Sequence, residues 1–408
     1  MFARQMASNE EEVAVRHSRK RLWVFGSVLA AACSGVVLAT FGGAVLAAVA
    51  GGVLTVGSAT EHSTGKDSTG LAQIESVVST RSQLWNAVVA DGNRYLLSGP
   101  RWTGQSGPQL AAARNGQIIP YPDAGWNEWK AGEDGARSFV NINALRRDPE
   151  GALWVVDTGA PTFGGDPLPG AAKLVKIDLR ENKVTRVIHF PPEVARKGSY
   201  VDDIRFNGKH AYLTDAGNAG IIVLDLDTGR SRRVLDRHPS TVASSNRPIV
   251  MEGQVLKGPD NRPLLVNSDP MELSPDGQWL YYGPLEGPWS RVPTSLLDDP
   301  KVTPQALDKA VRPFADLPPM GGSVMDAHGN LYFSDLKANA IRKRAPDGVI
   351  TTIACDPRLH WVDAMFITDD GQLLMPAAQI DRVPLFNQGV SRVEWPISLF
   401  TLKLAGQP

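Results

Sequence analysis

The sequence predicts an all-β fold, a six-bladed β-propeller, and three observations support this prediction. First, one phrase recurs six times: a short apolar run, a turn ending in glycine, and a second apolar run rich in Tyr, Trp, Leu and Val. Second, the turn glycines are 59, 57, 69, 52 and 42 residues apart, which leaves each unit room for about four short strands. Third, one more apolar segment stands at each end of the repeats. The glycines are Gly92, Gly151, Gly208, Gly277, Gly329 and Gly371.

Each repeated phrase is typical of the inner hairpin of a blade. Pairs such as Asp91-Gly92 tolerate positive φ, which a tight turn between right-twisted strands needs. A second hairpin follows in most units, as in residues 220–235 and 340–355, and it predicts the outer half of the blade. A β-sandwich is the structural alternative, but it would not require a sixfold phrase.

The two terminal apolar segments predict how the ring closes. Residues 71–79 precede the first repeat and residues 398–404 follow the last one. We expect them to pair in one blade, because this pairing would remove two exposed sheet edges at once.

The composition is that of an ordinary globular protein, with 42% hydrophobic residues, 21% charged residues and a net charge of -1. This charge is too low to favour a nucleic-acid partner, so we expect no nucleic acid to bind. The sequence also contains no Cys/His cluster with zinc spacing and no glycine-rich nucleotide-binding loop between a strand and a helix.

The N-terminus predicts export. Residues 1–21 form a basic segment expected in the cytoplasm, and residues 22–56 form a run of 35 residues without a charge. This run is longer than the ~20 residues needed to cross a bilayer, so it predicts a transmembrane anchor or a signal peptide. Residues 57–70 read as a flexible tether, and residues 71–408 as the propeller. The propeller would be anchored to the membrane on its extracytoplasmic side, or secreted or periplasmic if the segment is cleaved.

The starts of the inner strands predict a site. These strands all begin at one mouth of the central channel, and counting back six or eight residues from each turn glycine gives the residues that enter them. They are Asn86, Asn143, Asp202, Asp269, Gly321 and Asp363. We predict catalytic or proton-transferring roles for Asp202, Asp269 and Asp363. Asn86, Asn143, Asp203 and His360 are predicted to bind the ligand.

Three clustered carboxylates repel one another, so something should offset their charge. Oxygen ligands of this kind suit Ca²⁺ or another divalent cation, which Asp202 and Asp269 would hold. The alternative is that these aspartates and asparagines cap strand ends and accept hydrogen bonds from loop amides.

The chain resembles a known family in six segments that follow one another in consistent order over residues 80 to 390. They are GPRWTGQSGPQLAAARNGQIIPYPDAGWNEW (99–129), LWVVDTG (153–159), YVDDIRFNGKHAYLTDAGNAGIIVLDLDTG (200–229), LSPDGQWLYYGPL (273–285), GNLYFSDLKANAI (329–341) and HWVDAMFITDDG (360–371). The family is the yellow/major royal jelly protein family, and the chain looks most like its bacterial, dopachrome-tautomerase-related branch. The resemblance implies a six-bladed propeller that is usually secreted. It also implies either dopachrome conversion or the binding of small amines in the channel.

A more distant similarity is to the regucalcin/gluconolactonase propellers, which hold a divalent metal with acidic and asparagine side chains. Asp202 and Asp269 fall near that family's ligand positions. However, Gly321 stands where this family has an essential aspartate, and no glutamate lies near residues 84–86.

These observations predict an exported propeller that binds a small polar or aromatic molecule in its channel, with an isomerase of the dopachrome-tautomerase type as the reaction it would carry out. One alternative is a metal-dependent, gluconolactonase-like hydrolase. Another is a non-enzymatic scaffold that binds protein partners on its blade faces.

Overall fold

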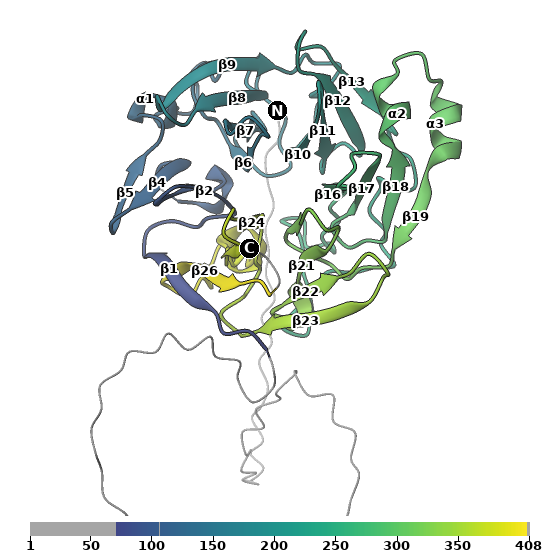
Figure 1. Cartoon of the computed structure of the whole chain (residues 1–408). Helices are drawn as coiled ribbons and strands as arrows, with labels where there is room; N and C mark the ends of the chain where they lie inside the picture. Colours follow the sequence, from purple (N-terminus) through teal and green to yellow (C-terminus); the bar gives the residue numbers. More distant parts are fainter. Residues whose placement is uncertain (1–70, 106, 406–408) are drawn as a thin grey trace, which may run out of the picture. The chain divides into compact units, whose positions relative to one another are not determined.

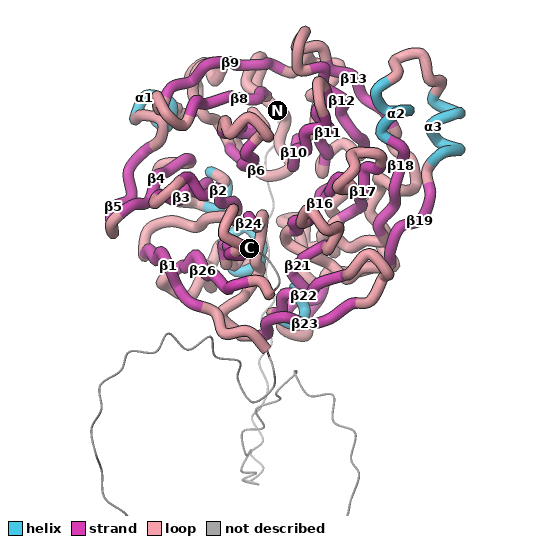
Figure 2. The backbone as a smooth tube through the Cα atoms, in the orientation of Figure 1, coloured by secondary structure: helices cyan, strands magenta, loops and turns pink. Residues whose placement is uncertain are grey.

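The computed structural model describes residues 71–105 and 107–405, which form a ring of six four-stranded sheets (Figure 1). All paired strands within these sheets are antiparallel. Figure 2 shows β2, β6, β10, β16 and β24, each an edge strand of its sheet, nearest the centre of the ring. The predicted six-bladed β-propeller is therefore confirmed.

The blades follow the order of the sequence, with their strands numbered from the centre outward except in blade 6. Blade 1 contains β2 (Ala87–Asp91), β3 (Arg94–Ser98), β4 (Leu110–Arg114) and β5 (Gln117–Pro120). Blade 2 contains β6 (Ile142–Arg147), β7 (Leu153–Asp157), β8 (Lys173–Asp178) and β9 (Lys183–His189). Blade 3 contains β10 (Val201–Asn207), β11 (His210–Asp215), β12 (Gly220–Asp225) and β13 (Ser231–Val234). Blade 4 contains β16 (Ser268–Leu273), β17 (Trp279–Pro284), β18 (Trp289–Pro293) and β19 (Arg312–Ala315). Blade 5 contains β20 (Ser323–Met325), β21 (Leu331–Asp335), β22 (Ala340–Arg344) and β23 (Ile350–Cys355). Blade 6 contains β24 (Phe366–Ile367), β25 (Gln372–Pro376), β26 (Ile397–Lys403) and β1 (Glu75–Thr80).

The repeated glycines lie in the turns between the first two strands of each blade, as predicted. In blade 1, Asp91 pairs with Arg94 across a turn in which Gly92 has φ +58°. Because an L side chain is strained at this φ, glycine is the residue that the turn requires. The outer hairpins predicted for residues 220–235 and 340–355 are present as β12–β13 and β22–β23.

The ring closes between the two ends of the repeat array. Strand β1 pairs with β26, with Ser79 opposite Ser398 and Thr80 opposite Ile397. The hydroxyl oxygens of Ser79 and Ser398 lie 2.8 Å apart. The predicted pairing of residues 71–79 with residues 398–404 is therefore confirmed, and it completes a blade of four strands.

The hydrophobic core is distributed around the ring rather than gathered at its centre. Six clusters of buried apolar side chains each join two neighbouring blades, so that every blade packs against both neighbours. Between blades 2 and 3, for example, Trp154 and Leu174 pack in one cluster with Ile204 and Leu213. The sheets therefore stabilise one another face to face and leave the ends of the inner strands to line the channel.

The connections between strands contain the remaining elements. The helices are α1 (Ala124–Asn127), α2 (Thr294–Asp298) and α3 (Pro304–Ala310), with 3₁₀ turns η1 (Arg101–Thr103), η2 (Leu336–Ala338), η3 (Ile380–Arg382) and η4 (Pro384–Phe386). The longest repeat, between Gly208 and Gly277, carries an extra hairpin of β14 (Val250–Met251) and β15 (Gln254–Val255).

The predicted basic segment (1–21), anchor or signal segment (22–56) and tether (57–70) lie outside the described residues. Within residues 71–105 and 107–405, no helix is long and apolar enough to span a membrane.

Candidate functional site

A cavity of about 390 Å³ lies where the inner strands begin. All six positions predicted from the strand starts line it, one from each blade. They are Asn86, Asn143, Asp202, Asp269, Gly321 and Asp363. The predicted convergence of these residues on one pocket is therefore what the structure shows, although their chemical roles are a separate question.

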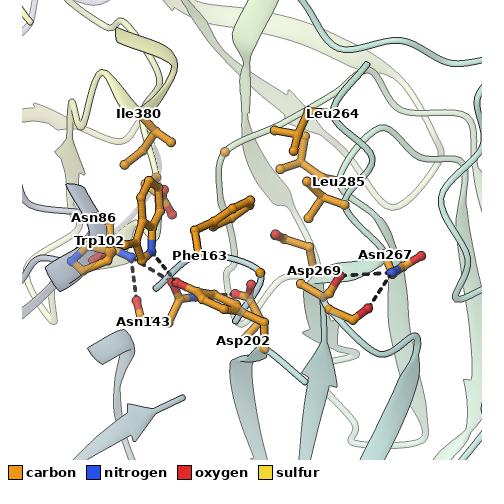
Figure 3. Close-up of a pocket in the computed structure, with 18 of the residues that line it drawn as sticks. Asn86, Trp102, Asn143, Phe163, Asp202, Leu264, Asn267, Asp269, Leu285 and Ile380 are labelled. Carbon is orange, nitrogen blue, oxygen red and sulfur yellow. Dashed lines mark hydrogen bonds between the residues drawn. The ribbon is translucent and has the colours of Figure 1, made fainter. Parts of the chain in front are cut away.

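Carboxyl and amide groups from neighbouring blades form one side of the cavity (Figure 3). The Asn143 side-chain N–H donates to Asp202 Oδ1 at 2.6 Å, and the Asn86 side-chain N–H donates to the backbone carbonyl of Asn143 at 2.6 Å. The carboxyl groups of Asp202, Asp269 and Asp363 line the same cavity. Ionisation of one of them disfavours ionisation of the others, so this side of the cavity can hold a proton.

The three cavity aspartates share a shift toward the protonated form. Burial, and next the charge of Asp269, raises the pKa of Asp202 well above its ordinary value. Burial and then the charge of Asp363 raise the pKa of Asp269, and burial and then the charge of Asp202 raise the pKa of Asp363. A cation placed among these groups would favour their charged forms, because an opposite charge nearby lowers a carboxyl pKa.

Two aspartates at the ends of second strands hold the segments that lead into the cavity. Asp157 accepts hydrogen bonds from the backbone N–H groups of Val140 and Asn141, both at 2.9 Å, just before β6 begins. Asp215 accepts from the backbone N–H of Tyr200 at 2.9 Å, just before β10 begins. These carboxylates are capping groups, and they fix the backbone from which Asn143 and Asp202 project.

Aromatic and aliphatic side chains form the other side of the cavity. The ring of Phe163 lies 4.9 Å from that of Trp102, 5.5 Å from that of Phe386 and 5.9 Å from that of Tyr200, measured between centroids. Figure 3 shows Leu264, Leu285 and Ile380 across the cavity from Asp202. These side chains come from the loops above the strands, and they offer an apolar surface to a bound molecule.

A further buried acid, Glu286, follows the cavity residue Leu285. Its Oε1 accepts the backbone N–H of Ser244 at 3.0 Å, whereas its Oε2 is buried and accepts no hydrogen bond from the described residues. Burial raises the pKa of Glu286 to about 7, and its charge is among those that raise the pKa of Asp269. The charge of Glu286 thus acts on Asp269 in the cavity, while its Oε1 holds Ser244 in the connection between β13 and β14.

Asp203, predicted to bind the ligand, does not line the cavity. It pairs with Arg205 at 2.7 Å and with Arg146 at 3.2 Å, and Arg205 pairs in turn with Glu272 at 2.7 Å. Ser323 Oγ donates to Glu272 Oε1 at 2.8 Å, so these five residues form a polar network across blades 2, 3, 4 and 5. Burial opposes the ionisation of Asp203, but its arginine partners lower its pKa below the ordinary value. We name these five residues the channel network.

The channel network lies farther along the inner strands than the cavity aspartates. A second cavity, of about 490 Å³, is lined by Arg146, Arg205 and Glu272 together with Val324 and Phe366. Residues from five inner strands line this cavity, and along β6, β10 and β16 they lie after the residues that line the first cavity.

His360, the other predicted ligand-binding residue, also lies outside the first cavity. It is 2% exposed, and its Nε2 lies 2.8 Å from Asp381 Oδ1 in η3. The backbone turns at Trp361, where φ is +51°, and it is Trp361 that lines the cavity.

The cavity does not offer a divalent cation an assembled ligand set. Among the residues that the structure describes, no group of three or more His, Cys, Asp or Glu side chains is arranged to hold a metal ion. The amide nitrogen of Asn143, rather than its oxygen, is turned toward Asp202. A Cβ atom added at Gly321 would lie 2.5 Å from the carbonyl oxygen of Val362, so the aspartate missing at this position could not simply be restored. The predicted calcium is therefore carried forward only as a proposal.

Several cavity residues lie outside the repeated sequence pattern. Tyr200 lies two residues before Asp202, and Trp102 lies within the segment 99–129 that carries the family resemblance. Phe163 and Phe386 belong to loops with no repeated pattern. A tyrosine beside a predicted strand start is the signal that could have identified Tyr200.

The chain is similar to curated insect proteins over part of its length. Protein yellow of Drosophila pseudoobscura pseudoobscura is 28% identical over 158 residues, which are 35% of this chain and 27% of that protein. Protein yellow of Drosophila melanogaster is also 28% identical over 158 residues, 35% of this chain and 28% of that protein. The similarity thus spans little more than a quarter of these relatives.

Solved structures with a similar arrangement include a gluconolactonase from Xanthomonas campestris, at a TM-score of 0.48 and 12% identity, covering 82% of this chain and 90% of that one. Virginiamycin B lyase from Staphylococcus aureus has a TM-score of 0.47 and 12% identity, covering 81% of this chain and 99% of that one. At TM-scores below 0.5, these likenesses say nothing about the chemistry of this chain.

The sequence also matches a family model, described as major royal jelly protein, over residues 143–404. This range begins at Asn143 in the cavity, contains the cavity aspartates, and ends one residue after β26. The matched range is more than half of the 408 residues. The chain therefore belongs to the major royal jelly protein family.

Proposed function

We propose that the protein binds a small cationic molecule with an aromatic or apolar body in the cavity of about 390 Å³. The observation that carries this proposal is the division of the cavity into two sides. Asp202 and Asp269 form an acidic side, and Trp102 and Phe163 belong to an aromatic side. The cavity volume is within the range of about 300–1,000 Å³ that small-molecule sites occupy.

The two sides together favour a protonated amine over a neutral or anionic molecule. Buried carboxyl groups without a cation are costly to ionise. Burial and then the charge of Asp269 raise the pKa of Asp202, and burial and then the charge of Asp363 raise the pKa of Asp269. An ammonium group among them would offset this charge, while an attached ring would pack against Phe163 and Trp102. A phosphate, or a carboxylate turned toward these aspartates, would instead be repelled.

We propose that the reaction at this site is an isomerisation of the dopachrome-tautomerase type. Such an isomerisation removes a proton from one position of the substrate and returns one at another, with no net change in composition. Neighbouring carboxyl groups, one protonated and one ionised, could supply both an acid and a base for these steps. Assignment to the bacterial, dopachrome-tautomerase-related branch is part of this proposal.

The predicted calcium and lactonase alternatives have less support. No glutamate stands near Leu84, and Gly321 leaves no room for the missing aspartate. Calcium bound by Asp202 and Asp269 is nevertheless kept as one arm of the experiment, because it too would offset their charge. An inert channel, with protein partners on the blade faces, is the outcome that would remain if nothing binds.

The experiment is calorimetry with tyramine, which joins a phenol ring to an ammonium group, and with 4-ethylphenol, its neutral counterpart. We expect tyramine to bind the wild type and 4-ethylphenol to bind weakly. The double variant Asp202→Asn/Asp269→Asn should lose the preference for the amine, and Asp227→Asn, at an exposed turn, should keep it. Equal binding of both compounds, or no binding of tyramine to the wild type, would refute the proposal. Thermal melts with added calcium and with a chelator test the metal in the same samples.

We also propose, on the N-terminal sequence alone, that the chain is exported and held at the membrane by residues 22–56. Sequencing the N-terminus of the membrane-bound protein tests this, since a start near Gly51 would show cleavage instead.

A further inference from the structure

The second cavity, of about 490 Å³, differs from the first one in its charge. Three arginines line it, whereas no described residue that lines the first cavity is an arginine or a lysine. They are Arg146, Arg147 and Arg205. The volume is within the range of about 300–1,000 Å³ that small-molecule sites occupy. The arginines indicate that a negatively charged molecule would suit this cavity.

The acids that line the second cavity are matched by other groups. Both carboxylate oxygens of Glu272 accept hydrogen bonds from Arg205, at 2.7 and 3.0 Å. Asp148 pairs with Lys176 at 3.1 Å. The Asp369 side chain is 95% exposed, so solvent screens its charge. These three acids therefore take up few of the donors that the two arginines of β6 offer.

Arg146 is largely buried, yet most of its guanidinium group has no partner. Only 12% of the side chain is exposed. Within the described residues its Nη2 alone donates hydrogen bonds, to the two oxygens of Asp203 at 3.2 and 3.4 Å. Its Nε is buried and has no hydrogen-bond partner there. A guanidinium group has five N–H donors, and a buried donor without an acceptor costs free energy, so an anion beside Arg146 would be stabilising.

Arg205 shows that charge balance alone does not explain this arrangement. Its Nε and Nη2 donate to Glu272, and its Nη1 donates to the backbone carbonyl of Ile204 at 2.8 Å. All three of its nitrogens thus have acceptors inside the protein. Pairing with Asp203 accounts for the charge of Arg146, but it leaves donors of Arg146 unused.

Arg147 adds a second positive charge beside Arg146. Its side chain is 34% exposed, and its Nη1 lies 3.7 Å from the exposed carboxylate of Asp369. It donates no hydrogen bond to any residue in the part of the chain that the structure describes. Arg147 is therefore free to turn toward an anion that enters from solvent.

The rest of the wall is apolar and favours an organic molecule over an inorganic ion. Side chains from blades 3 to 6 form this part of the lining, and they include two aromatic rings. They are Phe206, Leu273, Val324, Met325 and Phe366. An inorganic phosphate would leave this surface uncovered, whereas a ring or a short hydrocarbon chain would pack against it.

We propose that the second cavity binds a small organic carboxylate, with its charged group held by Arg146 and Arg147 and its apolar body against Phe206 and Phe366. A planar carboxylate matches the fork of donors that a guanidinium group presents. The inference does not rest on the proposed function, because none of the described residues that line this cavity lines the first one.

The test is calorimetry with benzoate and with benzamide, its neutral counterpart of similar shape, at constant chloride concentration. We expect benzoate to bind the wild type at least tenfold more tightly than benzamide, because only benzoate is charged. Inorganic phosphate should bind more weakly than benzoate. Equal binding of benzoate and benzamide, or no binding of benzoate, would overturn the inference, and phosphate that binds as tightly as benzoate would overturn the choice of an organic ligand.

Two variants and a control connect the binding to the arginines. Arg146→Lys keeps the charge but loses the planar fork, and it should weaken benzoate binding by on the order of tenfold. Arg147→Gln should weaken it several-fold without disturbing the buried network. Arg262→Gln removes an arginine whose side chain is 84% exposed and outside the cavity, so it should bind benzoate like the wild type. Unchanged binding in both cavity variants would contradict the assigned site.

The location of the ligand is tested without any variant, which keeps the inference open to refutation if Arg146→Lys does not fold. Anomalous scattering from crystals grown with 4-bromobenzoate should place the bromine atom between Phe206 and Phe366. Bromine in the first cavity or on the outer surface of the ring would refute the inference. Neither outcome bears on the binding of tyramine, so this site and the proposed function can fail separately.

Discussion

Replacing Glu286 by glutamine should make the protein more stable at alkaline pH and leave its stability at acid pH nearly unchanged. Glu286 is fully buried, and its Oε2 accepts no hydrogen bond from the described residues. A glutamine has the shape of the protonated acid, and its carbonyl oxygen can still accept the N–H of Ser244. The variant therefore imitates the folded protein at low pH and removes the charge that burial disfavours at high pH.

The size of the effect follows from the pKa of Glu286, which burial raises from 4.5 to about 7. Below about pH 4.5, the folded and unfolded chains both carry this proton, so the residue contributes no pH dependence. Between these two values the unfolded chain has released the proton while the folded chain keeps it, so the free energy of unfolding falls as the pH rises. The total loss is roughly 3 kcal/mol, since each pKa unit corresponds to about 1.4 kcal/mol.

The assay is urea unfolding of the wild type and of Glu286→Gln at pH 4.5 and at pH 8. Asp202, Asp269 and Asp363 also have raised pKa values, but they are present in both proteins, so the difference between the curves isolates Glu286. Glu150→Gln is the control, because the Glu150 side chain is 81% exposed and pairs only with Lys176 at the surface. If Glu286→Gln is less stable than the wild type by the same amount at both pH values, Glu286 is charged throughout and the reasoning fails.

Two further predictions concern the ring and its channel. A chain that starts at Arg81 lacks β1, so β26 loses its partner strand. Its free energy of unfolding should be about 2–4 kcal/mol lower than that of a chain that starts at Leu71. Melting temperatures within a degree of each other would show that the closure contributes nothing. Arg205→Met leaves Asp203 and Glu272 buried with fewer partners and should cost about 3–5 kcal/mol in denaturant unfolding. Most of that loss should return in Arg205→Met/Glu272→Met, and a double variant no better than the single one would contradict an ion-pair origin.

The fold and the meeting point of the strand starts could be predicted from the sequence because both depend on local, repeated features. Each turn glycine marks a hairpin, and a residue at a fixed distance before it enters the inner strand, so positions such as Asn143 and Asp269 follow from counting. The ring closure followed from two apolar segments that had no other partner.

Counting selected Asp202, which lines the cavity, but it could not show that the neighbouring Asp203, also predicted to bind the ligand, lies outside it. The register of β10 against β11 shifts between Val201 and Ile204, and this irregularity sets which of Asp202 and Asp203 faces the cavity. No propensity marks such a shift in advance. The aromatic side of the cavity escaped prediction for a related reason, since residues such as Phe163 come from loops whose paths depend on tertiary contacts.

The channel network limits how a small molecule can move through the centre of the ring. Its five side chains join blades 2 to 5 across the middle of the ring, and their charges are paired within the protein. A propeller channel can in principle be open at both ends, but here a molecule in the first cavity would meet buried ion pairs instead of a passage to the second. A molecule that binds in the first cavity would then enter and leave at the end of the channel where the inner strands begin. A macromolecule that covers the opposite end of the ring would leave this binding unaffected.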